Sequence, residues 1–190
     1  MLILIAGLIL FLAPHSVSIV NEPWRNRMVD RLGEMPWQGI YSVVALAGFI
    51  LIVWGYGLAR HNPAVIYTPP GAMRHIAWLL MLPVFPLLIA AYVPGRIRNA
   101  TKHPMLLATI LWAAAHLLAN GTLPDLLLFG SFLIWAIADR LSMTHRIQRP
   151  VPGFPLTRFN DIIAIVIGLG FYFAFLFGLH EWLFGAALAR

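Results

Sequence analysis

Six long apolar segments divide the chain, and each is close to the length needed to cross a bilayer. They occupy residues 2–20, 39–59, 73–93, 104–119, 123–139 and 161–184. A helix of about 20 apolar residues spans the hydrocarbon core. The apolar residues run continuously rather than alternating with polar ones, which argues against the strands of a membrane β-barrel. The pattern predicts an all-α, polytopic membrane bundle of about six transmembrane helices, in a single domain over residues 1–190.

Local signals mark several helix boundaries. Asn120 and Gly121 form a helix stop, and Pro124 suits the first turn of a new helix. Pro83 and Pro86 fall inside the third segment, where they predict a kink because proline cannot donate the helical hydrogen bond.

Two longer polar connections separate the segments. Residues 21–38 mix charges with apolar side chains, and we expect them to lie along the cytoplasmic interface with Trp24 and Trp37 as anchors. Residues 142–157 contain three prolines, which predict an irregular cytoplasmic loop.

The composition supports a membrane protein and excludes several chemistries. Hydrophobic residues make up 61% of the chain and charged residues 11%, whereas soluble domains average about 45–50% and about 25%. There is no cysteine, so disulfides, thiolate nucleophiles, iron–sulfur clusters and cysteine-bound zinc are excluded. The net charge of +6 fits basic loops beside anionic lipid headgroups better than it fits a nucleic-acid partner.

The basic residues predict the orientation. Ten of the thirteen lysines and arginines fall in the first, third and fifth loops: Arg25, Arg27, Arg31, Arg96, Arg98, Lys102, Arg140, Arg146, Arg149 and Arg158. The positive-inside rule places these loops in the cytoplasm. We therefore expect an inner-membrane protein of a bacterium, with both termini in the periplasm.

Two histidines lie within segments that otherwise resemble membrane hydrocarbon, His15 in the first and His116 in the fourth. A polar or ionisable group in lipid costs roughly 2 to 4 kcal/mol, so such groups usually bind or relay something. Neutral imidazole is a common ligand of haem iron and other transition metals. The leading interpretation is a haem b site with these two axial ligands, although their predicted depths differ by about 10 Å. The alternative is that each histidine separately hydrogen-bonds a neighbouring helix.

Four other histidines lie near the ends of the apolar segments or in a loop. His61 and His75 flank the second loop and are the alternative ligands if the second to fourth segments form the pocket. His180 stands beside Glu181, either as a supporting hydrogen-bond partner of a site or, as we favour, as an interfacial anchor. His145 lies in a basic loop, where we expect it to be solvated.

The third loop ends on a basic pair at the start of the fourth segment. Lys102 and His103 precede Pro104, which suits a first helical turn. They are either an N-terminal cap with headgroup contacts or a site for an anion such as a haem propionate. Lys102, Arg96 and Arg98 are the candidate propionate partners if the cofactor lies toward the cytoplasm. The carboxylates fall near segment ends, which suits capping better than acid–base catalysis.

Several segments resemble the NnrU family of bacterial membrane proteins. They are Pro14-His15-Ser16, residues 48–60 with Trp54-Gly55-Tyr56, Lys102-His103-Pro104-Met105, and residues 111–121 with His116. The family is associated with nitrite and nitric oxide reduction, and it is similar to plant cis-zeta-carotene isomerase, a haem b enzyme. The resemblance implies haem iron held by His116 and His15. Ala113 stands near a position where the plant enzyme has a cysteine that exchanges as ligand, so that redox switch cannot operate here.

Other function classes remain open. A basic-His-Pro motif at a helix start also resembles membrane methyltransferases that use S-adenosylmethionine, but the following tyrosine and the paired C-terminal glutamates of those enzymes are missing. A non-catalytic assembly or sensing protein is the third class. The expected partners are membrane lipid, a hydrophobic or gaseous small molecule, and respiratory or denitrification enzymes.

Overall fold

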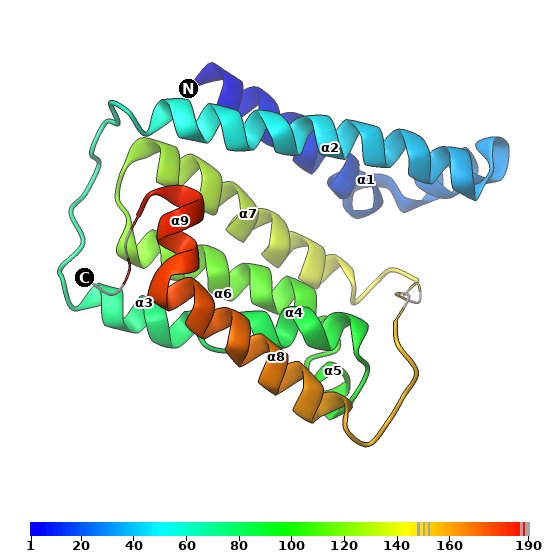
Figure 1. Cartoon of the computed structure of the whole chain (residues 1–190). Coiled ribbons are helices and arrows are strands. Elements are labelled where there is room, and N and C mark those ends of the chain that lie inside the picture. The colour runs from blue at the N-terminus through cyan, green and yellow to red at the C-terminus, as the bar shows by residue number, and fades with distance from the viewer. Residues whose placement is uncertain (148, 150, 152, 187, 189–190) are drawn as a thin grey trace. The chain divides into compact units, whose positions relative to one another are not determined.

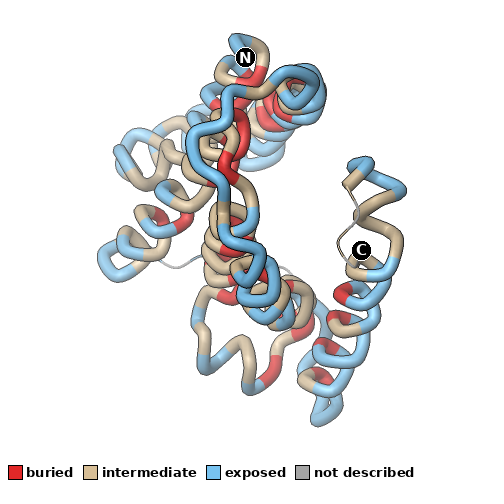
Figure 2. The backbone as a smooth tube through the Cα atoms, turned by 90° about the vertical axis from the view of Figure 1, so that its left-hand side faces the viewer, coloured by how far each residue is buried: buried red, intermediate tan, exposed pale blue. Residues whose placement is uncertain are grey.

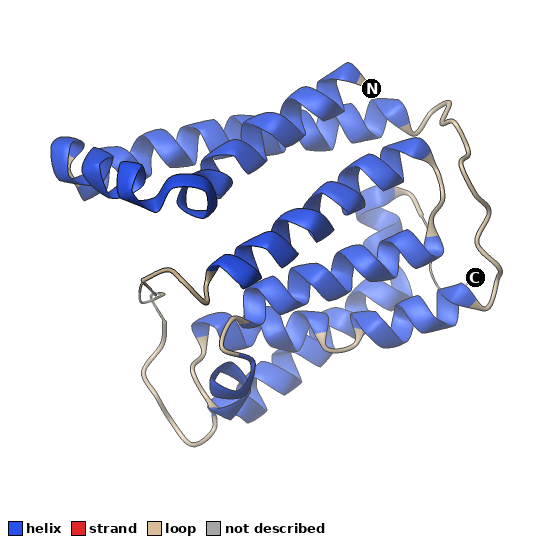
Figure 3. Ribbon diagram, turned by 180° about the vertical axis from the view of Figure 1, so that it is seen from behind, coloured by secondary structure: helices blue, strands red, loops and turns tan. Residues whose placement is uncertain are grey.

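Every helix or strand element named in the described residues is a helix. The computed structural model describes residues 1–147, 149, 151, 153–186 and 188 (Figures 1 and 3). The elements are α1 (Leu2–Leu32), α2 (Glu34–Ala59), α3 (Met73–Met81), α4 (Val84–Tyr92), α5 (Arg96–Thr101), α6 (Pro104–Ala119), α7 (Leu123–Ser142), α8 (Asn160–Ala174), the π-helix η1 (Phe175–Leu179) and α9 (His180–Phe184). Within these described residues the only β contact is an isolated bridge between Val65 and Thr122. The all-α prediction is confirmed.

The chain divides into two compact units. Unit 1 comprises Met1–Pro69 and Asn120–Ile147, and it contains α1, α2 and α7. Unit 2 comprises Pro70–Ala119 and Gln148–Arg190, and it contains the remaining helices. Whether the chain behaves as a single domain stays a prediction.

In unit 1 the helices α1 and α2 pack backbone against backbone at glycines of both helices. A Cβ atom on Gly7 would lie 2.6 Å from the backbone nitrogen of Ile52, and one on Gly48 would lie 2.5 Å from that of Phe11. A Cβ atom on Gly55 would lie 2.7 Å from the Cα atom of Leu4. Small residues allow this close approach, which is typical of helix pairs in membranes.

The first connection differs from the prediction, because residues 21–38 are mostly helical. Asn21 is non-helical, with φ −152° and ψ 75°, and its side-chain oxygen accepts a hydrogen bond of 2.9 Å from the backbone N–H of Trp24. This bond caps the rest of α1, which continues to Leu32. The indole rings of Trp24 and Trp37 meet edge to face, with centroids 6.0 Å apart. Their role as interfacial anchors stays a prediction.

Unit 2 is built around α4 and α6, whose residues Val84, Leu87 and Ala108 form a buried core cluster. The predicted kink in the third segment is confirmed, because α3 ends at Met81 and α4 begins directly after Pro83. Across the helix pair α4–α8, a Cβ atom on Gly168 would clash with the backbone of Pro86, so this contact also requires a glycine.

The carboxylate of Asp161, at the start of α8, caps the short helix α5. It accepts hydrogen bonds of 3.0 Å from the backbone N–H groups of Arg96 and Ile97. Residues 153–157, which belong to the predicted loop, are irregular as predicted, and the loop joins α4 through a 2.8 Å hydrogen bond from Phe154 N–H to the Tyr92 carbonyl. Pro150 and Pro152 lie outside the described residues.

Four helical stretches of the described chain are long and apolar enough to cross a membrane: Leu2–Leu32, Glu34–Ala59, Met73–Tyr92 and Asn160–Phe184. The apolar helix Pro104–Ala119 is shorter. Exposed positions follow the helices (Figure 2), and on α2 they include Val43, Leu46, Phe49 and Val53. Apolar side chains exposed along such helices indicate contact with membrane lipid.

Candidate functional site

His116 lies in the last turn of α6, in unit 2. Its Nδ1 atom lies 2.8 Å from the carbonyl oxygen of Trp112, one turn earlier in the same helix. A carbonyl oxygen only accepts, so in the neutral imidazole Nδ1 carries the proton and Nε2 carries the lone pair. The neighbouring Ala113 and Ala115 are fully buried, so the side of α6 beside this imidazole is packed closely.

His180 begins α9, where the chain departs from a regular α-helix. The last predicted segment is not one continuous helix, because α8 gives way to the π-helix η1, which contains the non-helical Gly178. After α9, Gly185 adopts the left-handed conformation with φ 68°. This turn brings the Ala186 carbonyl to 2.8 Å from Nδ1 of His180. His180 is therefore also protonated at Nδ1, with the lone pair on Nε2.

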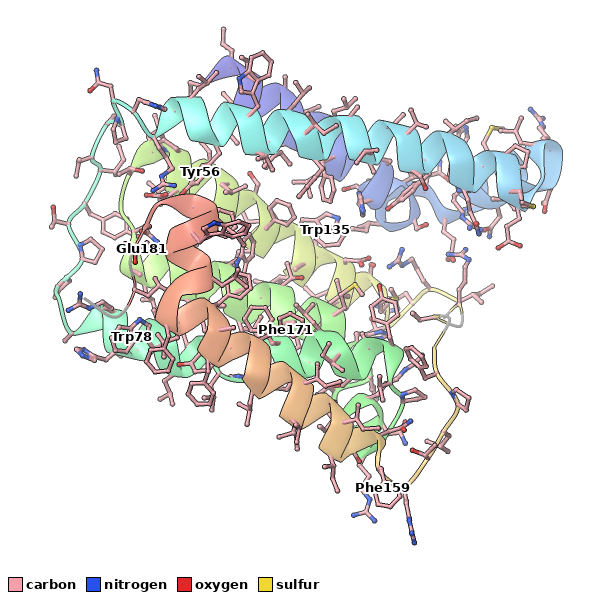
Figure 4. All side chains as sticks on the ribbon, viewed as in Figure 1. Tyr56, Trp78, Trp135, Phe159, Phe171 and Glu181 are labelled. Carbon is pink, nitrogen blue, oxygen red and sulfur yellow. The ribbon has the colours of Figure 1, made fainter. Side chains whose placement is uncertain are left out.

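The fold brings these two histidines together within unit 2. The centroids of the His116 and His180 rings are 6.5 Å apart, and the ring planes are inclined by 30°. The Trp112 ring flanks His116 at 5.3 Å, and the Phe184 ring flanks His180 at 5.1 Å. The labelled Glu181 marks this helix in Figure 4. Sequence reasoning missed the pair because the two histidines are far apart in the chain, and an interfacial anchor remained a sufficient explanation for His180.

His15 lies on α1, in unit 1, within an aromatic environment. Its Nδ1 atom donates to the carbonyl oxygen of Phe11 at 2.6 Å, which again leaves the lone pair on Nε2. The ring stacks on Phe11 at 4.3 Å and contacts Tyr41 at 5.0 Å and Trp135 at 5.8 Å, the last of which is labelled in Figure 4. Because His15 and His116 belong to different units, their shared ligation stays a prediction.

A buried ion pair lies near the C-terminal end of α7. Arg146 donates from its guanidinium to the carboxylate of Asp139, and the exposed fractions of the two side chains are 10% and 11%. The Ser142 hydroxyl also donates to this carboxylate, at 3.3 Å. The two partners are seven residues apart across the end of the helix, a spacing that gives no signal in the sequence.

The other predicted site residues lie at helix ends. His61 follows α2 and is exposed, with Nδ1 2.9 Å from the carbonyl oxygen of Gly57. His75, on α3, meets Trp78 edge to face at 5.1 Å and is also exposed. Neither histidine is placed beside His116 by a described contact, and their role as ligands stays a prediction.

The basic candidates lie on α5 and at its junction with α6. Arg96 and Arg98 belong to α5, and Lys102 ends it with φ 61°. His103 directly precedes α6, and its carbonyl accepts the N–H of Leu107 at 3.2 Å. The predicted helix start is therefore confirmed, whereas propionate binding stays a prediction.

Asp125 has the capping role that the sequence predicts for the carboxylates near segment ends. It forms a capping box with Thr122, whose hydroxyl lies 2.5 Å from the carboxylate. The same carboxylate accepts a 2.6 Å hydrogen bond from the Tyr56 hydroxyl on α2. Within the described part of the chain, no group of three or more histidines and carboxylates is arranged to hold a metal ion.

Comparison with known proteins identifies one family. The profile of the family described as NnrU protein matches residues 3–188, which is nearly the whole chain. No curated protein and no solved structure gave a significant match.

Proposed function

The chain belongs to the NnrU family, and from this membership we propose that it is a haem b-binding membrane protein whose iron is bound by His116. The observation that carries the proposal is the 2.8 Å hydrogen bond from His116 Nδ1 to the Trp112 carbonyl. This bond fixes the ring orientation and makes Nε2 the nitrogen that can bind iron. Metal-binding histidines commonly donate their other ring N–H to such a carbonyl.

The donors present fit haem b in number and kind. Haem iron takes one or two axial ligands from the protein, and imidazole is a common one. His116 supplies an imidazole from an apolar helix, and Ala113 and Ala115 beside it are small. When bound, the haem would supply one-electron chemistry or a coordination position for a small molecule such as nitric oxide.

The residues of this chain would bind and orient the cofactor. The resemblance names His15 as the second residue that would hold the haem, and His15 has the same Nδ1–carbonyl hydrogen bond as His116. Lys102, Arg96 and Arg98 are the cations proposed for the haem propionates. Apolar helices around the site would exclude water, which strengthens electrostatic interactions within it.

We place the protein in the bacterial inner membrane as a multi-pass protein with both termini in the periplasm. The distribution of lysine and arginine over alternate loops supports this orientation. A role linked to nitric oxide or denitrification follows from the family association. A carotenoid-isomerase-like activity is the second role that the resemblance implies.

Haem content in the detergent-purified protein tests this proposal. His116→Ala is expected to lose most of the haem while still inserting into the membrane. The control His145→Ala, at an exposed position, is expected to keep the haem content of the wild type. Full haem retention by His116→Ala would contradict the ligand assignment, and a pyridine haemochrome assay of the three proteins decides between these results.

A further inference from the structure

The last part of α1 is a separate helix that follows the break at Asn21. We call this part, residues 22–32, the α1 extension. The apolar part of α1, residues 2–20, is about 28 Å long as a helix, which is close to the ~30 Å thickness of the hydrocarbon core. The α1 extension adds about 17 Å of helix. It therefore lies outside the hydrocarbon that residues 2–20 are long enough to cross.

One face of the α1 extension combines apolar and basic side chains. Trp24, Arg27, Met28 and Arg31 follow the spacing i, i+3, i+4, i+7, which places them on the same side of a helix. Trp24 is 40% exposed, and both arginines are exposed as well. Tryptophan beside basic residues is the combination that helices at a membrane–water interface carry.

The two arginines of this face have no partner within the protein. Neither Arg27 nor Arg31 forms a hydrogen bond or an ion pair with any residue that the structure describes. Arg25, on a different side of the same helix, donates to the side-chain oxygen of Asn26 at 3.4 Å. Like charges four residues apart destabilise a helix. The helix dipole favours Arg31 in the last turn but does not account for Arg27, so an external anion would relieve a repulsion that the chain itself leaves unbalanced.

The acidic residues of the α1 extension lie mainly on another face. Glu22 and Asp30 are separated by eight positions in register with Asn26, and Glu22 is half-buried. Asp30 is exposed and lies three residues after Arg27, so it partly offsets the positive charge of the basic face. Two exposed arginines against one exposed carboxylate leave this face positive.

We propose that the face formed by Trp24, Arg27 and Arg31 binds the headgroups of anionic phospholipids. A lipid surface fits this face better than an acidic protein does, because the face follows directly on the membrane-spanning part of α1. Val20, at the end of that part, is 83% exposed. An indole ring that lies among headgroups allows the guanidinium groups beside it to reach the phosphates. The positive-inside rule assigns this side of the membrane to the cytoplasm.

The test measures which lipid gathers beside the α1 extension. Because the chain has no cysteine, Leu32→Cys provides a single labelling site at the exposed end of this face. A fluorophore attached there, in the full chain reconstituted into phosphatidylcholine bilayers, is quenched by spin-labelled phosphatidylglycerol or by spin-labelled phosphatidylcholine. Phosphatidylglycerol is expected to quench at the lower concentration, and 1 M salt is expected to remove most of this preference, since the Debye length is then ~3 Å.

Variants on the two faces separate a specific surface from net charge. Arg27→Gln and Arg31→Gln are each expected to lower the preference for phosphatidylglycerol about fivefold, and the double variant roughly 25-fold, because one basic residue near an anionic surface contributes about that factor. Arg25→Gln removes the same charge from the same helix and is expected to keep the preference of the parent protein. Asp30→Asn is expected to increase the preference.

Two results would overturn the proposal. The first is equal quenching by the two lipids in the labelled parent protein. The second is an equal loss of preference in Arg25→Gln and Arg27→Gln, because net charge alone would then account for the effect. If the double variant does not insert into the bilayer, the single variants decide. The measurement does not require haem, so its outcome is independent of the proposed haem function.

Discussion

The close contact between α1 and α2 makes a quantitative prediction at Gly55. A Cβ atom there would lie 2.7 Å from the Cα atom of Leu4 and 2.8 Å from the carbonyl carbon of Ile3, and both atoms belong to the backbone. Ordinary contacts to a Cβ atom are 3.4–4 Å. Gly55→Ala therefore forces the two helices apart, because no flexible side chain can yield. Overpacking of this kind costs about 1–3 kcal/mol in free energy of unfolding.

Gly57 provides the matched control on the same helix. A Cβ atom at this position meets nothing within 4 Å. Replacing a helix-interior glycine by alanine stabilises a helix by roughly 0.5–1 kcal/mol, so Gly57→Ala is expected to be neutral or stabilising. The two variants should therefore differ by about 1.5–4 kcal/mol.

The assay is reversible unfolding of the purified protein in mixed micelles, followed by far-ultraviolet circular dichroism. A thermal melt is an alternative, in which each kcal/mol corresponds to about 2–4 °C in Tm for a chain of this size. Equal stabilities for Gly55→Ala and Gly57→Ala would contradict this prediction, because they would mean that α1 and α2 are not in backbone contact at this point.

Two polar contacts of unit 1 give further predictions for the same unfolding assay. Tyr56→Phe removes a 2.6 Å hydrogen bond to the buried carboxylate of Asp125 and is expected to cost about 1.5–3 kcal/mol; a change within measurement error would contradict the contact. Asp139→Ala leaves Arg146 without its buried partner and is expected to cost about 3 kcal/mol, whereas Asp139→Asn should cost less because it keeps an acceptor. Equal losses for these two variants would argue against the ion pair.

The sequence predicts the fold class and several helix boundaries because the signals are local. The fourth predicted segment coincides with α6, since Pro104 begins it and the Asn120-Gly121 pair follows it. The break between α3 and α4 follows from Pro83. These boundaries depend on the backbone chemistry of residues within one helical turn. They can therefore be predicted directly from the sequence.

The continuation of α1 beyond Asn21 is not predicted, because residues 21–38 are interpreted as a connection that lies along the interface. A helical signal is nevertheless present, since Trp24, Met28 and Leu32 recur at intervals of four residues. Apolar spacing carries more information about a helix at a membrane interface than the presence of charge does, because one face of such a helix is expected to be polar.

The candidate site is only partly predictable. That His116 is an unusual residue follows from its apolar surroundings, which the sequence shows. The position of His180 beside His116 cannot be predicted in this way, because it depends on the π-helix η1 and on the left-handed Gly185. Contacts of this kind join residues that are distant in the chain and depend on backbone geometry. The spacing of residues along the sequence therefore does not predict them.

The most direct test of the account is the absorption spectrum of the purified wild-type protein, oxidised and then reduced with dithionite. We expect a Soret band at a stoichiometry of one haem per chain, with the sharp α and β bands of low-spin haem b on reduction. A protein that remains colourless after haem is supplied during expression would contradict it.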